Sequence, residues 1–191
     1  MFTGQPSGWR PLVPNRFALA RYTANGSLDT TFGNGGKLLL PVGAGDDFAL
    51  SVLVQPGDGK IVVAGFSEGS DGNRDASIVR VDAHGAPDAT FGNNGRVVLP
   101  MSADPGAFGN GAETISLLAD GKLLVGGFAS TPNGSVNAIA RLNADGSLDA
   151  GFALREAGFG SFPAAYTENG AAVALEPTAS VHDVDLAVAG S

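Results

Sequence analysis

Short runs of alternating apolar and polar residues, separated by glycine-rich turns, form the main pattern along this chain. Residues 77–82 alternate with the period of two that is typical of a half-exposed strand. The apolar runs at 49–55 and 60–66 flank a Pro-Gly-Asp-Gly sequence, which predicts a hairpin. A fourth run at 96–99 ends at Pro100, whose nitrogen cannot donate to a further strand. Glycine and proline interrupt the chain too often for long helices, so we predict an all-β fold.

This four-run pattern recurs along the chain with a period of about sixty residues, a length found in repeat folds. Every copy carries an arginine, an aspartate and a phenylalanine at matching places around a turn. The three sets are Arg21, Asp29 and Phe32; Arg80, Asp88 and Phe91; and Arg141, Asp149 and Phe152. A glycine that follows the second run recurs as Gly65, Gly127 and Gly190. So many positions in register indicate true internal repetition.

A single four-stranded unit cannot bury both faces of its sheet, so the units must stack on one another. Four strands per unit and a period of tens of residues predict a β-propeller-type repeat with about three four-stranded blades. Residues 1–15 form an irregular N-terminal segment, and the repeat domain is 16–191. Within this domain, one blade is expected at about 49–100 and another at about 113–163. The third blade is split between 171–191 and 16–41. A β-solenoid is the alternative, but its coils are usually shorter.

The split blade raises the question of how the array closes. Three blades are too few for an ordinary propeller. Two alternatives therefore stay open, a homodimer that completes a six-bladed ring, and a chain that is one piece of a longer propeller.

The turn and hairpin motifs also have a family signature. The pattern R-x-x-x-x-G-S-L-D-x-x-F-G-x-x-G is followed by P-x-G-K-I-V-V-A-G, on residues Arg21, Gly26, Ser27, Leu28, Asp29, Phe32, Gly33, Gly36, Gly59, Lys60 and Gly65. This pattern resembles the delta-60 repeat family of bacterial β-propeller-like proteins, over about residues 16–191. The copies depart from it at Pro87, after Phe152 and near His182, where Asp-Gly-Lys is absent. The resemblance implies an extracytoplasmic or cell-surface setting and a non-enzymatic role, and it brings no ligand or catalytic residue with it.

Composition and charge narrow the classes of function. The net charge of −8 argues against a protein that binds nucleic acid through its phosphates. The count of Cys 0 excludes disulfides, thiolate metal sites and a cysteine nucleophile. No run approaches the roughly 20 apolar residues of a membrane helix. The first residues lack the basic and apolar regions of a signal peptide, so an exported protein would have lost its signal or carried it outside this chain.

The residues that recur in every copy are expected to be scaffold. Asn and Asp before glycine fit β-turn chemistry better than calcium loops, which need regularly spaced oxygens and a final glutamate. We expect the arginines to pack across neighbouring blades and the phenylalanines to fill the core between them. No motif indicates a catalytic residue, a cofactor site or a metal site. His182, with Asp183 and Asp185, is only a weak candidate for metal ligation.

Segments that differ between the copies are where individual function is expected, because binding usually lies on loops of a rigid scaffold. These segments are 42–48, 67–75, 101–112 and 130–136, which this propeller register places on one face. The candidate partner-binding residues on that face are its carboxylates, Asp46, Asp47, Glu68, Asp71, Asp75, Asp104 and Glu113. A solvated acidic rim is the simpler explanation of the same residues.

Three hypotheses for function follow. We favour a non-enzymatic surface or extracytoplasmic module that binds a protein or glycan partner or acts as a scaffold. The second is a carbohydrate-active enzyme, whose first candidates are Asp46, Asp47, Asp104 and Glu113, with carboxyl groups about 5.5 Å or about 6.5–9.5 Å apart. The third is a structural piece of a longer repeat protein.

Overall fold

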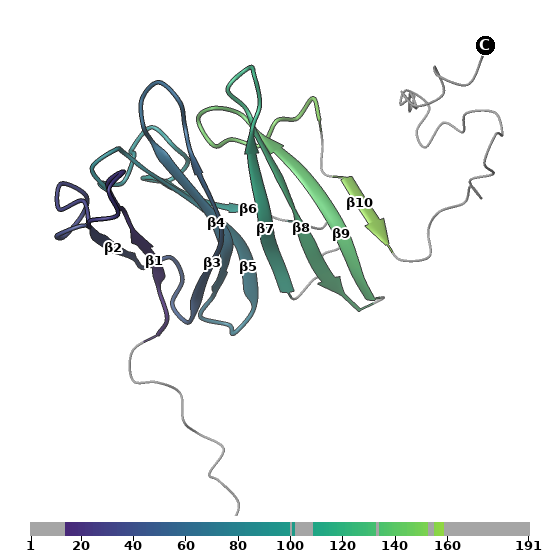
Figure 1. Cartoon of the computed structure of the whole chain (residues 1–191). Coiled ribbons are helices and arrows are strands. Elements are labelled where there is room, and N and C mark those ends of the chain that lie inside the picture. The colour runs from purple at the N-terminus through teal and green to yellow at the C-terminus, as the bar shows by residue number, and fades with distance from the viewer. Residues whose placement is uncertain (1–13, 100, 102–108, 133, 153–154, 159–191) are drawn as a thin grey trace, which may run out of the picture. The chain divides into compact units, whose positions relative to one another are not determined.

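The computed structural model describes residues 14–99, 101, 109–132, 134–152 and 155–158, and every regular element among them is a β-strand (Figure 1). The strands are β1 (Phe17–Ala20), β2 (Lys37–Leu40), β3 (Asp47–Val54), β4 (Ile61–Glu68), β5 (Arg74–Val81), β6 (Arg96–Leu99), β7 (Gly109–Leu117), β8 (Leu123–Thr131), β9 (Gly134–Leu142) and β10 (Arg155–Gly158). The all-β prediction is confirmed. No helix in the described ranges is long and apolar enough to cross a membrane.

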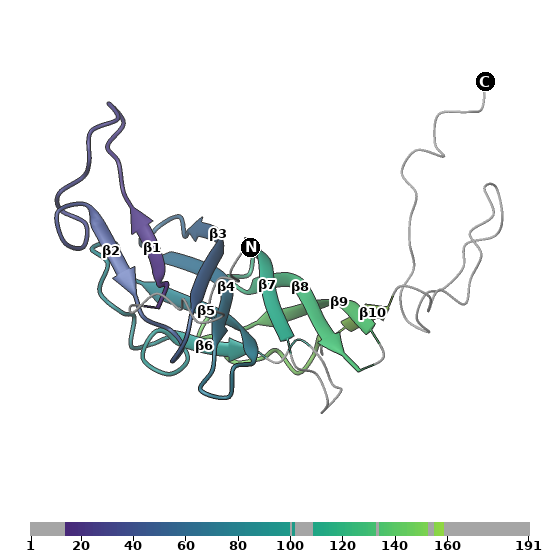
Figure 2. The same cartoon turned by 90° about the horizontal axis from the view of Figure 1, so that it is seen from below.

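The strands form two antiparallel meanders and one hairpin. Strands β3 to β6 pair in chain order as the first meander, and β7 to β10 pair in the same way as the second meander. Strands β1 and β2 form the N-terminal hairpin. A single parallel pair, Arg74 with Gly109, joins the two meanders, which Figures 1 and 2 show as separate twisted ribbons. The meanders are the four-stranded units that the repeat predicts. The number of blades stays a prediction. The strands expected at 171–191 lie outside the described residues and stay a prediction as well.

Several strands are longer than the sequence pattern predicts. Strand β4 ends at Glu68 and β5 begins at Arg74, so the variable segment 67–75 contains only a short loop. Strand β7 begins at Gly109, within the segment 101–112 that we expected to be a loop. Hydrophobic alternation stops before the ladder does, because backbone hydrogen bonds continue through polar residues at the ends of a hairpin.

The recurring glycine of the second strand is explained by a close approach of backbones. A Cβ atom on Gly65 would lie 1.9 Å from the carbonyl oxygen of Phe48, and one on Gly127 would lie 1.9 Å from that of Gly111. Both glycines face a register irregularity in the neighbouring strand, β3 or β7. A β-bulge of this kind leaves no room for a side chain on the opposite strand. The repeat therefore preserves this glycine for packing.

Two hydrophobic clusters hold the units together. The first lies between the meanders and includes Ile78, Phe91 and Leu123, each fully buried. The second lies between the N-terminal hairpin and the first meander and is built around Phe17 and Phe32. Each unit thus buries one face against its neighbour, as stacked repeats require.

Candidate functional site

The repeated arginine, aspartate and phenylalanine form one compact cluster in each unit. In the first meander, the Arg80 Nε donates to Asp88 Oδ2 at 2.8 Å. The Arg80 guanidinium lies 4.4 Å from the centroid of the Phe91 ring, a cation–π distance. The aspartate also accepts the backbone N–H of Thr90 at 3.0 Å. The same cluster recurs around Arg21 and Arg141, which confirms the expected packing role.

The clusters of Arg21 and Arg80 also reach the turn of the following unit. The Arg80 Nη1 donates to the carbonyl of Ala144 at 2.7 Å, and the backbone N–H of Gly92 donates to the carbonyl of Asp145 at 2.7 Å. One unit earlier, the matching donors and acceptors are Arg21 with Ala83 and Gly33 with His84. These bonds link neighbouring units at part-buried sites, so the repeated charges serve the scaffold.

The lysine of each Asp-Gly-Lys turn joins the same cluster. Lys60 Nζ lies 3.1 Å from Asp88, and Lys122 Nζ lies 2.7 Å from Asp149. Burial raises the pKa of Asp88, but hydrogen bonds from Thr90 and Lys60 and the charge of Arg80 outweigh it and hold that pKa well below its usual range. The hydrogen bond from Lys122 is the main cause that lowers the pKa of Asp149 to about 2.

The lowered pKa of Asp149 predicts acid-dependent stability. In the unfolded chain, the Asp149 carboxyl has its ordinary pKa of 3.8. In the folded chain, it stays ionised at lower pH values, where it would already be protonated in the unfolded chain. Its stabilising effect is therefore complete above about pH 4 and disappears as the pH falls towards about 2. We expect Asp149→Asn to be less stable than the parent chain at neutral pH, with the difference shrinking between about pH 4 and pH 2. Urea unfolding followed by far-UV circular dichroism measures it, and a constant difference down to pH 2 would contradict the assignment.

The described residues contain no group of three or more histidine or acidic side chains placed to hold a metal ion. His84 lies in the turn after β5, where its backbone N–H donates to Asp82 Oδ1 at 2.8 Å, an Asx-turn contact. His182 and its neighbouring aspartates lie outside the described residues.

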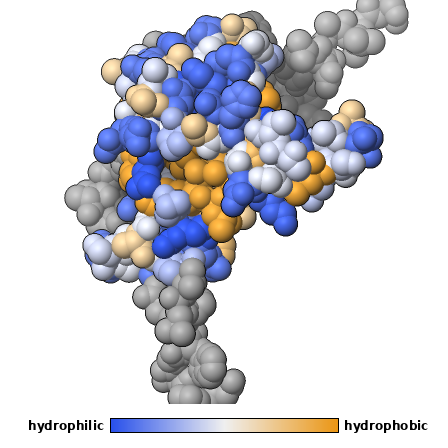
Figure 3. Space-filling model, turned by 90° about the vertical axis from the view of Figure 1, so that its left-hand side faces the viewer, coloured by the Kyte–Doolittle hydropathy of each residue, from blue (hydrophilic) through white to orange (hydrophobic). Residues whose placement is uncertain are grey.

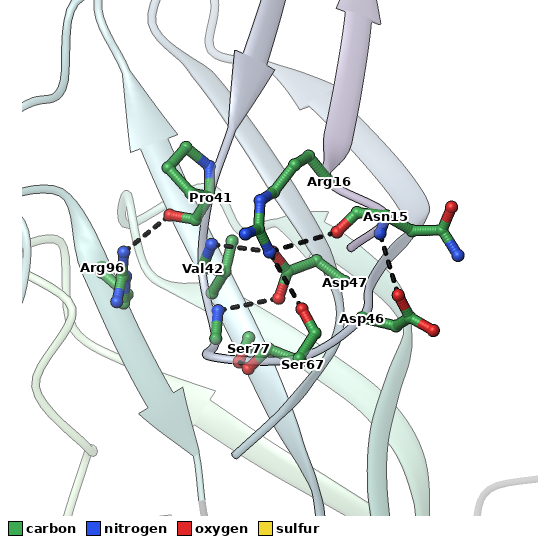
Figure 4. A network of polar contacts seen from close by, with 11 residues as sticks. Asn15, Arg16, Pro41, Val42, Asp46, Asp47, Ser67, Ser77 and Arg96 are labelled. Atoms are coloured by element: carbon green, nitrogen blue, oxygen red, sulfur yellow. Dashed lines mark hydrogen bonds and ion pairs between the residues drawn. The ribbon is translucent and has the colours of Figure 1, made fainter. Parts of the chain in front are cut away.

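Asp47 is the most constrained carboxylate of the variable segments. It is 1% exposed, at the first position of β3. Its Oδ2 accepts the backbone N–H of Val42 at 2.9 Å and the Arg16 Nη1 at 3.2 Å, while its Oδ1 accepts the N–H of Gly43 at 2.7 Å (Figure 4). The carboxylate thus fixes the loop between β2 and β3 against the segment before β1. Its side chain is not presented to solvent, whereas the neighbouring Asp46 is half-buried and its Oδ1 accepts the backbone N–H of Asn15 at 2.8 Å.

The structure brings two of the variable segments together. The backbone N–H of Glu68 donates to the carbonyl of Asp46 at 2.9 Å, and the N–H of Gly45 donates to the carbonyl of Glu68 at 2.9 Å. A shallow, open pocket lies between them. Its lining is formed by Ala44, Gly45, Glu68, Gly69, Ser70, Asp71 and Gly72. We refer to this region, the segments 43–46 and 68–75, as the acidic loop pair.

The remaining predicted carboxylates have different settings. Asp71 caps its own turn by accepting the backbone N–H of Asn73 at 3.0 Å. Partial burial is the main cause that raises the pKa of Asp75, and the negative charge of the nearby Asp71 adds to the rise. Glu113 is exposed within β7, and Asp104 lies outside the described residues. The glycosidase hypothesis, which combines Asp46 and Asp47 with those two residues, stays a prediction.

Comparison with known proteins addresses the repeat rather than the loops. Residues 13–32, 57–91 and 118–152 match the model of a family described as "Domain of unknown function (DUF5122) beta-propeller". The chain matches a β-propeller family. Together with the all-β strands, this match establishes a fold of the propeller type. That family is related to the delta-60 repeats, and the likeness of this chain to the delta-60 family itself stays a resemblance. No curated protein and no solved structure matches the chain.

Each matched segment ends at the repeated phenylalanine, Phe32, Phe91 or Phe152. The matches therefore include the arginine–aspartate–phenylalanine clusters and the segment 68–75 of the acidic loop pair, and they leave out its segment 43–46. Sequence reasoning missed that Asp47 is buried, and it missed the lysines of the clusters. The lysines had a signal, since both stand in Asp-Gly-Lys turns that recur with the repeated aspartates. Asp47 had none, because its side-chain partner Arg16 is distant in sequence and its other partners are backbone N–H groups, which carry no residue signature.

Proposed function

We propose that this chain is a non-enzymatic propeller-type scaffold that presents the acidic loop pair to a cationic partner, a protein or a glycan. The observation that carries the proposal is the contrast between two kinds of charge. The carboxylates of the repeated clusters are bound to arginine and lysine, whereas Asp46 and Asp71 lie on loops and Asp75 lies at the start of β5, in segments that differ between the copies.

The support for binding at this place is both structural and electrostatic. The loops are anchored by buried Asp47 and by backbone hydrogen bonds to Glu68, so a partner would meet a largely preformed surface. The pKa of Asp75 is raised mainly by burial, and the nearby negative charge of Asp71 adds to the rise, a like-charge repulsion that a cation would relieve. Clustered carboxylates on a rigid scaffold favour association with positive charge.

An oligo-lysine peptide is a suitable probe for this proposal. Isothermal titration calorimetry should detect binding that weakens as the ionic strength rises, because exposed charges are screened. We expect the triple variant Asp46→Asn, Asp71→Asn, Asp75→Asn to bind on the order of tenfold more weakly, from the roughly 0.2–1 kcal/mol of each exposed ion pair.

The matched control is the triple variant Asp58→Asn, Asp120→Asn, Asp145→Asn. It changes the net charge equally, and each of its aspartates caps a backbone N–H two residues on, as Asp71 does. The control should bind the peptide nearly as well as the parent chain. Equal losses in both triple variants would show that only the overall charge matters, and the absence of binding to the parent chain would reject a cationic partner.

A further inference from the structure

The junction between units depends on a glycine of the turn, and one copy of that glycine has no neighbouring unit against it among the described residues. A Cβ atom on Gly85 would lie 3.2 Å from Cε2 of Phe32, and one on Gly146 would lie 2.9 Å from Cε2 of Phe91. Both glycines are buried against the preceding unit. Gly26 occupies the same place in the N-terminal hairpin, but it is exposed and its Cβ position meets nothing within 4 Å. Within the part of the chain that the structure describes, the hairpin therefore has the glycine side of a junction and no phenylalanine packed on it.

The second meander has the other side of such a junction, the side that carries the arginine and the phenylalanine. Arg21 and Arg80 each use Nη1 to bind a carbonyl in the turn of the next unit. Arg141 keeps the bond from its Nε to Asp149 and the stacking on Phe152, but no described residue provides the matching carbonyl. In the hairpin turn, the matching carbonyls belong to Ala24 and Asn25, which are exposed and accept no hydrogen bond from the described residues.

Apolar side chains show the same imbalance at both faces. Ile78 is 0% exposed in the junction between the meanders, whereas Ile139, at the same place in the second meander, is 44% exposed. Ile115 is 8% exposed in that junction, whereas Val52, at the same place in β3, is 60% exposed. Strand β3 also exposes Leu50 and Val54. Figure 3 views the molecule from the side on which the hairpin lies, and it shows hydrophobic residues gathered on that side and ringed by polar ones.

We propose that a second copy of this chain docks on these faces, with the Arg141–Phe152 end of one copy against the Ala24–Gly26 turn of the other. Arg141 Nη1 then binds the Ala24 carbonyl, and the Phe152 ring packs on Gly26, as Phe91 packs on Gly146 within the chain. The donor face and the acceptor face belong to the same chain, so a second copy fits both ends at once. Two such head-to-tail contacts close a symmetric ring, and closure leaves no face uncovered.

The proposal is independent of the acidic loop pair, because none of the contacting residues belongs to it. The contact uses residues that the chain already uses twice between its own units. We therefore expect the interface between the two copies to have the same geometry as the junctions within the chain at Gly85 and Gly146.

Gly26→Asn tests the proposal with little risk to folding. Gly26 has φ of 82°, a left-handed conformation that asparagine tolerates better than other residues, and its surroundings are open in one copy. In the proposed contact, the new side chain would collide with Phe152 of the other copy. Sedimentation equilibrium of the full chain should give twice the chain mass for the parent. The variant should dissociate at a concentration at least about tenfold higher, since overpacking a tight contact is strongly unfavourable.

Gly121→Asn is the matched control. Gly121 has φ of 83°, its N–H donates to Leu118 just as that of Gly26 donates to Thr23, and its Cβ position is equally open. The control should keep the parent mass, and circular dichroism should show both variants folded. Arg141→Lys is a second interface variant and should weaken the dimer because lysine cannot bridge Asp149 and a carbonyl as a fork. A parent chain that stays monomeric at all concentrations, or a dimer that Gly26→Asn and Gly121→Asn affect equally, would overturn the proposal. A monomer would mean that a different chain, or this chain's own residues, cover the faces.

Discussion

Replacing Phe91 with alanine should destabilise the folded chain by about 3–5 kcal/mol, the usual cost of deleting a buried aromatic side chain. The ring is 0% exposed in the cluster between the two meanders. It supports Arg80 on one side at 4.4 Å and lies against Gly146 of the next unit on another. The space left by the ring cannot collapse easily, because its walls belong to both meanders. Urea unfolding followed by far-UV circular dichroism measures the loss.

Phe48→Ala is the control for this prediction. Its side chain belongs to β3, is 38% exposed and stacks on Phe66 at 5.0 Å between centroids. Its truncation should cost less than about 1.5 kcal/mol, since much of the ring is already in water. Equal losses for the two variants would mean that the junction between the meanders contributes no more than a surface contact.

Arg80→Ala should cost about 3 kcal/mol, the lower end of the range for removing one partner of a buried ion pair. The side chains of Arg80 and Asp88 are 5% and 7% exposed, and removing the arginine leaves the aspartate and the Ala144 carbonyl without that donor. Lys60 stays within 3.1 Å of Asp88 and limits the loss. The same unfolding measurement applies, at neutral pH, where the carboxylate is ionised.

Arg21→Ala is the matched control, because it removes the equivalent arginine from a wetter site. The side chains of Arg21 and Asp29 are 29% and 22% exposed, so the loss should be about 1 kcal/mol. A double-mutant cycle of Arg80 with Phe91 should show a coupling of about 2 kcal/mol from the desolvated cation–π contact. A coupling near zero, or equal losses at Arg21 and Arg80, would contradict the environment described for the first meander.

The repeat made much of the fold predictable from local patterns. These patterns depend only on residues close in sequence. They are the period of two, the Asx-Gly turns and the spacing of Arg80, Asp88 and Phe91, which recurs in three copies. They predicted the four strands of each unit, with β6 at the predicted residues and the others shifted or extended at their ends. They also predicted that the repeated charges belong to the scaffold. Strand ends were less predictable, because ladders continue through polar residues such as those at 67–68 and 74–75.

The candidate loop region was predictable in outline and not in detail. Variation between copies identified the segments, and the structure places 43–46 beside 68–72. Sequence could not separate Asp46 from Asp47, although one is half-buried and the other is buried. The Asp47 carboxylate is held by the backbone N–H groups of Val42 and Gly43 in its own loop and by Arg16, which only the tertiary fold brings to it.

The sequence by itself determined the unit, its strands and the residues that hold one unit to the next. The tertiary structure alone decided how equivalent residues differ. Arg80 is enclosed and Arg141 is not, and Gly146 is buried while Gly26 is open, although their local sequences are nearly the same. The physical reason is that a repeat encodes one junction many times, whereas exposure depends on whether a neighbouring unit is present to complete it.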